Sequence, residues 1–216
     1  MREHEKDESK PRKGPLKVIN LFGAPGVGKS GTRAGVFWLM KTKQMSVEEV
    51  SEYAKFLVLS GRRWQLERDQ LSVLANQHHK MLILDQVYDF AVTDSPLMLA
   101  SFYAPPGTPK SFGAVCEEYA AQYANVNFFL TRDLSRDFES EGRVHGREDS
   151  IRIEGEQKEF LASRGCDWFD LPIDDVAPWA LLERLEKLFP GSVPERGPAK
   201  PAGSEPARAP ARKLAC

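Results

Sequence analysis

The stretch INLFGAPGVGKSGT, residues 19–32, decides the fold. An apolar run leads into a glycine-rich turn that carries one lysine and one serine, and residues 23–30 match G-x-x-x-x-G-K-[S/T] at every fixed position. In such a loop the glycines let successive backbone N–H groups point at phosphate oxygens, the lysine reaches the β- and γ-phosphates, and the serine hydroxyl binds Mg²⁺. A glycine turn that only joined a strand to a helix would not require Lys29 and Ser30.

The sequence on either side of this loop strengthens the prediction of a site for ATP and Mg²⁺. A strand is expected over residues 16–22 and a helix over residues 30–43, so the helix N-terminus adds its partial positive charge to the phosphate site. The residues predicted to contact the nucleotide are Gly23, Ala24, Pro25, Gly26, Val27, Gly28, Lys29, Ser30, Gly31, Thr32 and, farther along the chain, Arg132. Ser30 is also a predicted ligand of the metal ion.

The rest of the chain alternates short apolar strands with helical segments. Strands are expected over residues 16–22, 45–51, 88–96, 126–133 and 166–172, and helices over residues 30–43, 52–60, 63–84, 111–124, 151–165 and 174–189. Pro96 is expected to close its strand and open the next helix. This alternation is typical of a parallel sheet covered by helices on both faces. It predicts an α/β, P-loop NTPase fold of the nucleoside monophosphate kinase type.

Composition divides the 216 residues into one domain and two tails. Residues 1–15 are charged throughout, and residues 190–216 are rich in Pro, Ala, Gly and Arg, so both are expected to be disordered. The catalytic domain is expected over residues 16–189. The C-terminal tail carries five Lys/Arg against two Glu, which suits either contact with a polyanion or a plain solvated extension.

The net charge, the cysteine spacing and the lengths of the apolar stretches each make some classes of protein less expected. The formal net charge of −1 provides no overall field for capturing nucleic acid, so any such binding requires a local patch or the basic tail. Cys116, Cys166 and Cys216 lack the close spacing of a zinc or redox site, which predicts reduced thiols in a cytoplasmic protein. No apolar stretch is long enough to span a bilayer, so no membrane partner is expected. The sequence does not indicate an oligomeric state.

Two carboxylates are candidates for the catalytic centre. Asp94 follows the apolar strand that ends in FAVT, where a carboxylate that binds the metal ion is expected; the alternative is an N-cap for the following helix. Glu52 stands at the predicted end of the second strand, on the same sheet edge. It could take a proton from an acceptor hydroxyl or hold the acceptor, or it could only interact with a helix dipole.

The remaining motifs favour phosphoryl transfer over a motor or a switch. The chain has little room for the helical lid domain of an AAA-type motor, and it lacks the N-K-x-D motif that reads guanine. A kinase needs a mobile cover that excludes water and brings arginines to the phosphate. Residues 132–150 are the predicted lid, and Arg143 and Arg147 are its predicted catalytic contacts, although these arginines could equally form an exposed charged surface.

Five segments together resemble a known group of proteins. They read NLFGAPGVGKSGT, SEYAKFLV, RDQLSVLANQHHKM, YDFAVTDSPLML and NFFLTRD. In this order they resemble small P-loop kinases of tailed bacteriophages, related to the thymidylate-kinase-like nucleotide kinases. The resemblance covers about residues 18–170. One departure is that Gly31 stands where many relatives have a second Ser or Thr, which puts a contact to the α-phosphate in doubt unless Thr32 replaces it.

The resemblance implies a specific acceptor. Characterised members of the group look like kinases that phosphorylate 5-hydroxymethyluracil in viral DNA, a step in thymine hypermodification that protects phage DNA from host restriction. By position, residues 23–30 would bind ATP, Asp94 would serve Mg²⁺ or the acceptor, and Glu52 would lie on the acceptor side. Apart from the resemblance, Arg62, Arg63, Trp64 and Gln70 are candidates to face the acceptor, although Arg62 and Arg63 could equally be a solvated start of a helix.

Two alternatives stay open at the level of sequence. The acceptor could be a free deoxynucleoside monophosphate, which needs arginines to offset charge repulsion more than it needs a base. The chain could also be a nucleotide-gated binding module without transfer activity. An acceptor in duplex DNA would have to reach into the cleft or be extruded from the base stack.

Overall fold

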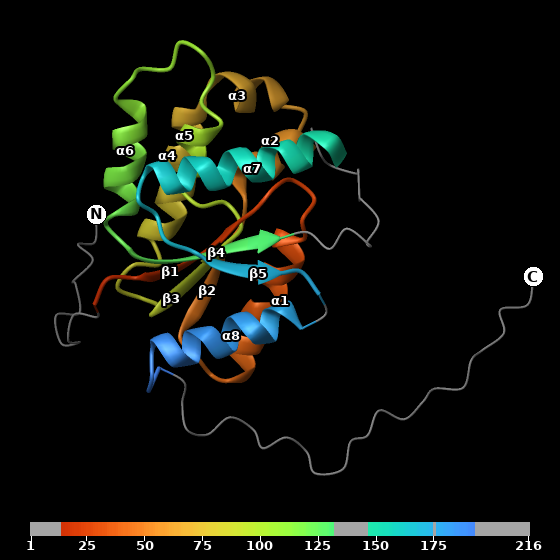
Figure 1. Ribbon diagram of the computed structural model, residues 1–216. Coiled ribbons are helices and arrows are strands. Elements are labelled where there is room, and N and C mark those ends of the chain that lie inside the picture. Colours follow the sequence, from red (N-terminus) through yellow and green to blue (C-terminus); the bar gives the residue numbers. More distant parts are fainter. Residues whose placement is uncertain (1–13, 132–146, 175, 193–216) are drawn as a thin grey trace, which may run out of the picture.

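The computed structural model describes residues 14–131, 147–174 and 176–192, which form a five-stranded sheet with helices on both faces (Figure 1). The strands are β1 (Lys17–Phe22), β2 (Val47–Val50), β3 (Phe90–Thr93), β4 (Ala124–Thr131) and β5 (Phe169–Pro172). The helices are α1 (Lys29–Thr42), α2 (Tyr53–Leu59), α3 (Arg63–Arg68), α4 (Gln70–Leu82), α5 (Leu99–Phe102), α6 (Phe112–Ala120), α7 (Arg147–Ser163) and α8 (Ala177–Leu188).

All strand pairings are parallel, in the spatial order β2-β3-β1-β4-β5. In the register of β1 and β3, Asn20 lies opposite Thr93. The loop that begins at Gly23 and the carboxylate of Asp94 therefore leave the sheet at the same edge. Ligands of open α/β sheets bind at this carboxyl edge.

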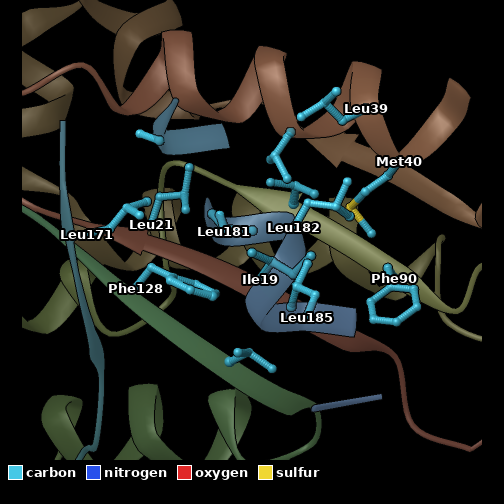
Figure 2. Packing of buried hydrophobic residues seen from close by; sticks show 14 of the residues in the cluster. Ile19, Leu21, Leu39, Met40, Phe90, Phe128, Leu171, Leu181, Leu182 and Leu185 are labelled. Atoms are coloured by element: carbon cyan, nitrogen blue, oxygen red, sulfur yellow. The ribbon is translucent and has the colours of Figure 1, made fainter. Parts of the chain in front are cut away.

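Both faces of the sheet are apolar, which is why helices cover both. Ile19 and Leu21 of β1 pack on one face beneath α1 and α8, as Figure 2 shows for part of this core. Val18 and Phe22 belong to the core on the opposite face, where α4 to α7 lie (Figure 1). Strands buried on both sides carry nearly continuous apolar runs, so the sequence pattern and the layering agree.

The contact between α1 and α8 requires a glycine. A Cβ atom at Gly35 would lie 2.8 Å from Cγ of Pro178, closer than non-bonded carbon atoms approach. Gly35 thus lets α8 pack directly against the helix that follows the phosphate loop.

The expected fold class is confirmed, with two corrections along the chain. The single helix expected over residues 63–84 is wrong, because α3 and α4 are separate helices that break at Asp69 (φ −135°, ψ 69°). The Asp69 side chain accepts a hydrogen bond from the Ser72 backbone N–H at 2.9 Å and so starts α4 as its N-cap. Pro96 does not open the next helix either, since α5 begins three residues later, at Leu99.

The sequence predicts no membrane-spanning stretch. Within the part of the chain that the structure describes, no helix combines the length and the apolar character needed to cross a bilayer.

Candidate functional site

The loop between β1 and α1 adopts a backbone that only glycines accommodate easily. Gly23, Gly26 and Gly28 have φ angles of 134°, 85° and 104°, all in the region that side chains disfavour. At Gly23, an added Cβ atom would also lie 2.9 Å from the carbonyl oxygen of Leu130 in β4. The glycines of the motif are therefore required by the turn itself and by its close approach to the neighbouring strand.

Lys29 is the first residue of α1 and folds back over this loop. Its Nζ donates hydrogen bonds to the carbonyl oxygens of Gly23 at 2.6 Å and Ala24 at 3.0 Å. The ammonium group is thus held above the turn, where the motif predicts the β- and γ-phosphates.

The residues after Lys29 differ in accessibility. Ser30 is partly exposed, and Gly31 is exposed with open space where a Cβ atom would lie. Thr32 is only 5% exposed. The predicted contact of Thr32 to the α-phosphate stays a prediction.

Helix α7 supports the loop from the other side, through residues that the sequence did not indicate. The Gln157 side chain is fully buried, accepts a hydrogen bond from the Gly23 N–H at 3.2 Å and donates one to the Tyr103 hydroxyl at 3.1 Å. The Ser150 hydroxyl donates to the Pro25 carbonyl oxygen at 2.5 Å. Gln157 lies 134 positions from Gly23, so no local pattern could have revealed this contact.

Asp94 directly follows β3 and is one partner of a buried ion pair. Nη1 of Arg33 lies 2.9 Å from Oδ1 of Asp94, and the side chains of Arg33 and Asp94 are 15% and 1% exposed. Nε of Arg33 lies 3.5 Å from Oε2 of Glu49. The alternative role of Asp94 as an N-cap is not observed, since Met98 precedes α5 and no side chain caps that helix.

Arg33 is a site residue that the sequence reading missed. It lies on α1 four positions after Lys29, and residues with this spacing share one face of a helix. That spacing was the available signal, because it places a second cation one turn beyond the phosphate-loop lysine.

Glu52 stands immediately before α2, but its side chain makes no capping hydrogen bond. Burial raises the pKa of its carboxyl group above the ordinary value of 4.5, the charge of Lys29 lowers it, and the charge of Asp94 raises it. The three charges therefore act on one another at the carboxyl edge of the sheet. A carboxylate with a raised pKa holds a proton more readily than usual, as a general base must.

Glu52 lines a narrow cavity of about 40 Å³ between α2, α3, α4 and α5. The polar side chains around it are Glu52, Gln70, Gln77, Ser95 and Tyr103, and the other lining residues are apolar. None of these lining residues carries a positive charge. Burial raises the pKa of Tyr103 to about 12, so its hydroxyl stays neutral near pH 7, and Glu52 is the only carboxylic acid among the described residues that line the cavity.

Gln77 fixes one wall of this cavity. Its side chain accepts a hydrogen bond from the Tyr53 N–H at 3.3 Å and donates one to the Thr93 hydroxyl at 3.2 Å. It is 2% exposed. One buried glutamine therefore ties α2, α4 and the end of β3 together around Glu52 and Asp94.

The other predicted site residues fall in different places. Arg132 and Arg143 lie outside the described residues, as does most of the predicted lid. Arg147 is the first residue of α7, and its side chain also lies outside the description. Their predicted contacts to phosphate stay predictions. Of the acceptor-side candidates, Gln70 lines the cavity, whereas Arg63 and Trp64 are exposed on α3.

Comparison with solved structures tests the fold. A crystal structure of NadR protein in complex with NAD and AMP-PNP superposes with a TM-score of 0.56 and 14% sequence identity over 80% of this chain. The chain has a P-loop kinase-like fold. It spans about half of the NadR chain, 49% by length.

One further solved structure is similar to this chain. Thymidylate kinase from Ehrlichia chaffeensis is also similar, with a TM-score of 0.48 and 15% identity over 79% of this chain and 100% of that one. No protein-family model matches the sequence, and no curated protein does.

Proposed function

We propose that this protein is an ATP-dependent kinase that transfers the γ-phosphoryl group to the hydroxymethyl group of 5-hydroxymethyluracil in DNA. The observation that carries the proposal is the environment of Glu52. Its pKa is raised, the charge of Lys29 acts on it, and the described residues that line its cavity include no cation. This arrangement suits an acceptor that is neutral and has a proton to lose.

The nucleotide half of the proposal rests on the loop. The N-terminus of α1 adds partial positive charge to this loop, and Lys29 covers the turn. The NadR structure of the same fold was determined in complex with AMP-PNP, which supports an ATP-type ligand here.

The donor set also fits Mg²⁺. A serine hydroxyl and an aspartate carboxylate are oxygen ligands, which this ion prefers, and Mg²⁺ in kinases is held by one or two such groups together with phosphates. The described residues hold no group of three or more His, Cys, Asp or Glu that could bind a metal ion by themselves. Ser30 and Asp94 would hold the ion, which supplies charge neutralisation at the transferred phosphoryl group.

The side chains around the cavity beside Glu52 favour an alcohol over a phosphate as the acceptor group. A nucleoside monophosphate carries negative charge into its site and requires cations there. The cavity beside Glu52 instead presents a carboxylate, two glutamines and a tyrosine. An alcohol is a weak nucleophile that benefits from a base, which Glu52 can provide.

The proposed step balances as follows. The acceptor oxygen forms a bond to the γ-phosphorus while the bond from that phosphorus to the β–γ bridging oxygen breaks, and ADP leaves. The hydroxyl proton moves to the Glu52 carboxylate. Lys29 stabilises the negative charge on the phosphoryl oxygens throughout.

The choice of modified DNA as the acceptor is supported by the resemblance to phage kinases. In that setting the phosphate makes the hydroxymethyl carbon a better electrophile for later substitution. This chemistry agrees with a role in thymine hypermodification and in protection against host restriction.

The test offers several acceptors in parallel. Purified protein would be incubated with Mg²⁺ and γ-labelled ATP, together with DNA containing 5-hydroxymethyluracil, thymine DNA, free deoxynucleoside monophosphates or free 5-hydroxymethyldeoxyuridine. The expected result is label on the hydroxymethylated DNA, recovered as a phosphomethyl base after digestion, and none on thymine DNA.

Two results would contradict this proposal. Label on a free monophosphate in preference to hydroxymethylated DNA would identify an enzyme of the nucleotide pool. Binding of ATP without label on any acceptor would indicate a binding module.

A further inference from the structure

The hairpin of α2 and α3 exposes large apolar side chains beside the acceptor cavity. Phe56, Leu59 and Trp64 are 52%, 70% and 61% exposed, and no described part of the chain covers them. Trp64 lies at the start of α3. Figure 1 shows α2 and α3 at the same end of the molecule, on the face of the sheet opposite to α1 and α8.

The same hairpin is positively charged in a protein whose formal net charge is −1. Residues 53–68 contain Lys55, Arg62, Arg63 and Arg68 against the single acid Glu67, a local net charge of +3. Two of these cations already have partners, since the Arg62 guanidinium lies 5.0 Å from the ring centroid of Phe56 and Nε of Arg63 lies 2.6 Å from Oε1 of Glu67. We call Lys55, Phe56, Leu59, Arg62, Arg63 and Trp64 the α2–α3 patch.

The patch adjoins the cavity in which Glu52 lies. Ala54 of α2 and Leu66 of α3 line that cavity, so each helix presents one part of its surface to the cavity and another part to solvent. A substrate group inside the cavity would therefore have its flanking parts next to the patch.

Exposed aromatic rings among cations are the features that bind single-stranded nucleic acid. Bases stack on the rings, while Lys and Arg neutralise the phosphates. A hydroxymethylated base has to leave the stack to reach a buried carboxylate, which exposes its neighbours to such a surface. A free nucleoside has no neighbouring nucleotides and gains nothing from it.

We propose that the α2–α3 patch binds the DNA strand on either side of the acceptor base, with Trp64 as a stacking platform and Arg62 and Arg63 as phosphate contacts. This inference rests on the proposed function for the identity of the acceptor. It explains how a chain without a basic overall charge can engage DNA.

The test separates binding from transfer. Binding of a short fluorescein-labelled single strand that contains one 5-hydroxymethyluracil would be followed by anisotropy at several salt concentrations. Trp64→Ala is expected to weaken binding about tenfold, and Trp64→Phe, which keeps a ring, much less. Trp38→Ala is the matched control, because Trp38 is equally exposed at 61% but lies on α1, on the opposite face of the sheet.

A second variant measures the charge contribution. The double variant with Arg62→Ala and Arg63→Ala loses two phosphate contacts. The plot of log affinity against log salt concentration is therefore expected to become less steep, with the magnitude of its negative slope smaller by about 1.4. The loss of transfer rate in the patch variants is expected to be larger with the hydroxymethylated strand than with free 5-hydroxymethyldeoxyuridine, which has no flanking nucleotides to contact the patch.

The outcomes distinguish this inference from the proposed function. Unchanged DNA binding by Trp64→Ala, or equal weakening by Trp38→Ala, overturns the inference, even where hydroxymethylated DNA is phosphorylated. Absence of label on every acceptor refutes the proposed function, and the anisotropy titration still decides whether the patch binds a strand.

Discussion

Four charged side chains meet where β1 and β3 end, and each constrains the others. Lys29 covers the phosphate loop, and Arg33 pairs with Asp94. The charges of these three residues all shift the pKa of Glu52. Buried charges are tolerated only when they are paired or hydrogen-bonded. Substitutions that remove one of these charges are therefore expected to have large effects on stability and activity.

Lys29→Ala is expected to lower kcat/KM for phosphoryl transfer by at least about 100-fold, because a cation at the transferred phosphate is lost. Because the two hydrogen bonds from its Nζ to the carbonyl oxygens of Gly23 and Ala24 are lost as well, the free energy of unfolding should fall by about 2 kcal/mol. Lys110→Ala, at an exposed position, is the control for both assays. Normal turnover of the Lys29 variant would refute the phosphate-loop interpretation.

Arg33→Met is expected to destabilise the protein by about 3 kcal/mol, because it leaves the buried Asp94 carboxylate without its partner. Adding Asp94→Asn removes the stranded charge and should recover part of the loss. Urea unfolding of the two single variants and the double variant gives the coupling energy. A coupling energy near zero would show that the pair does not contribute to stability.

Glu52→Gln should separate stability from activity. Because the folded-state pKa lies above 4.5, the folded protein binds this proton more tightly than the unfolded chain does. Ionisation of Glu52 therefore costs stability as pH rises above 4.5, and the glutamine variant avoids that cost. The variant should gain stability relative to the natural protein as the pH rises above 4.5, and it should lose about 100-fold in transfer rate. A stability difference that does not change with pH would contradict the burial of this carboxylate.

At the scale of secondary-structure elements, local capping competes with helix propensity. The residues 63–84 have the composition of one long helix, yet Asp69 interrupts it and redirects the chain. The break gives α3 an orientation of its own, so that Leu66 faces the cavity while Trp64 remains exposed.

Asp69→Ala is expected to destabilise the protein by about 1 kcal/mol, because the Ser72 N–H loses its acceptor. Asp69→Asn keeps a side-chain oxygen at the same position and should be close to the natural protein. Thermal unfolding of the two variants provides the comparison, and equal losses in both would mean that the charge matters rather than the cap.

At the scale of the whole molecule, two apolar layers enclose the sheet, and the last described residues close one of them. Phe189 packs on this core, with its ring centroid 5.5 Å from that of Phe90 and 5.5 Å from Nζ of Lys17. The composition of residues 193–216 offers no apolar run to extend this packing.

Truncation of the chain therefore has a sharp boundary. A chain that ends at Ser192 should keep its Tm within about 1 °C, whereas one that ends at Leu188 loses Phe189 and should melt about 5 °C lower. Differential scanning calorimetry distinguishes the two. A large drop for the longer chain would show that the C-terminal tail contributes to the folded core.

The sequence by itself determined the features that depend on neighbouring residues. Residues 23–30 predict the phosphate loop because the cradle is built from consecutive backbone groups. The strands and most helices follow from apolar runs and turns, and Asp94 is identified by its place after a buried strand. These signals are local, and the P-loop kinase-like fold follows from them.

Only the tertiary structure decided what depends on distant residues and on burial. Arg33 meets Asp94 across 61 positions, and Gln157 meets Gly23 across 134. The raised pKa of Glu52 arises mainly from desolvation, and the uncharged character of the other described residues around its cavity arises from which side chains α2, α3, α4 and α5 bring together. No pattern of adjacent residues encodes these properties, because desolvation and electrostatic coupling depend on distances that exist only after the chain has folded.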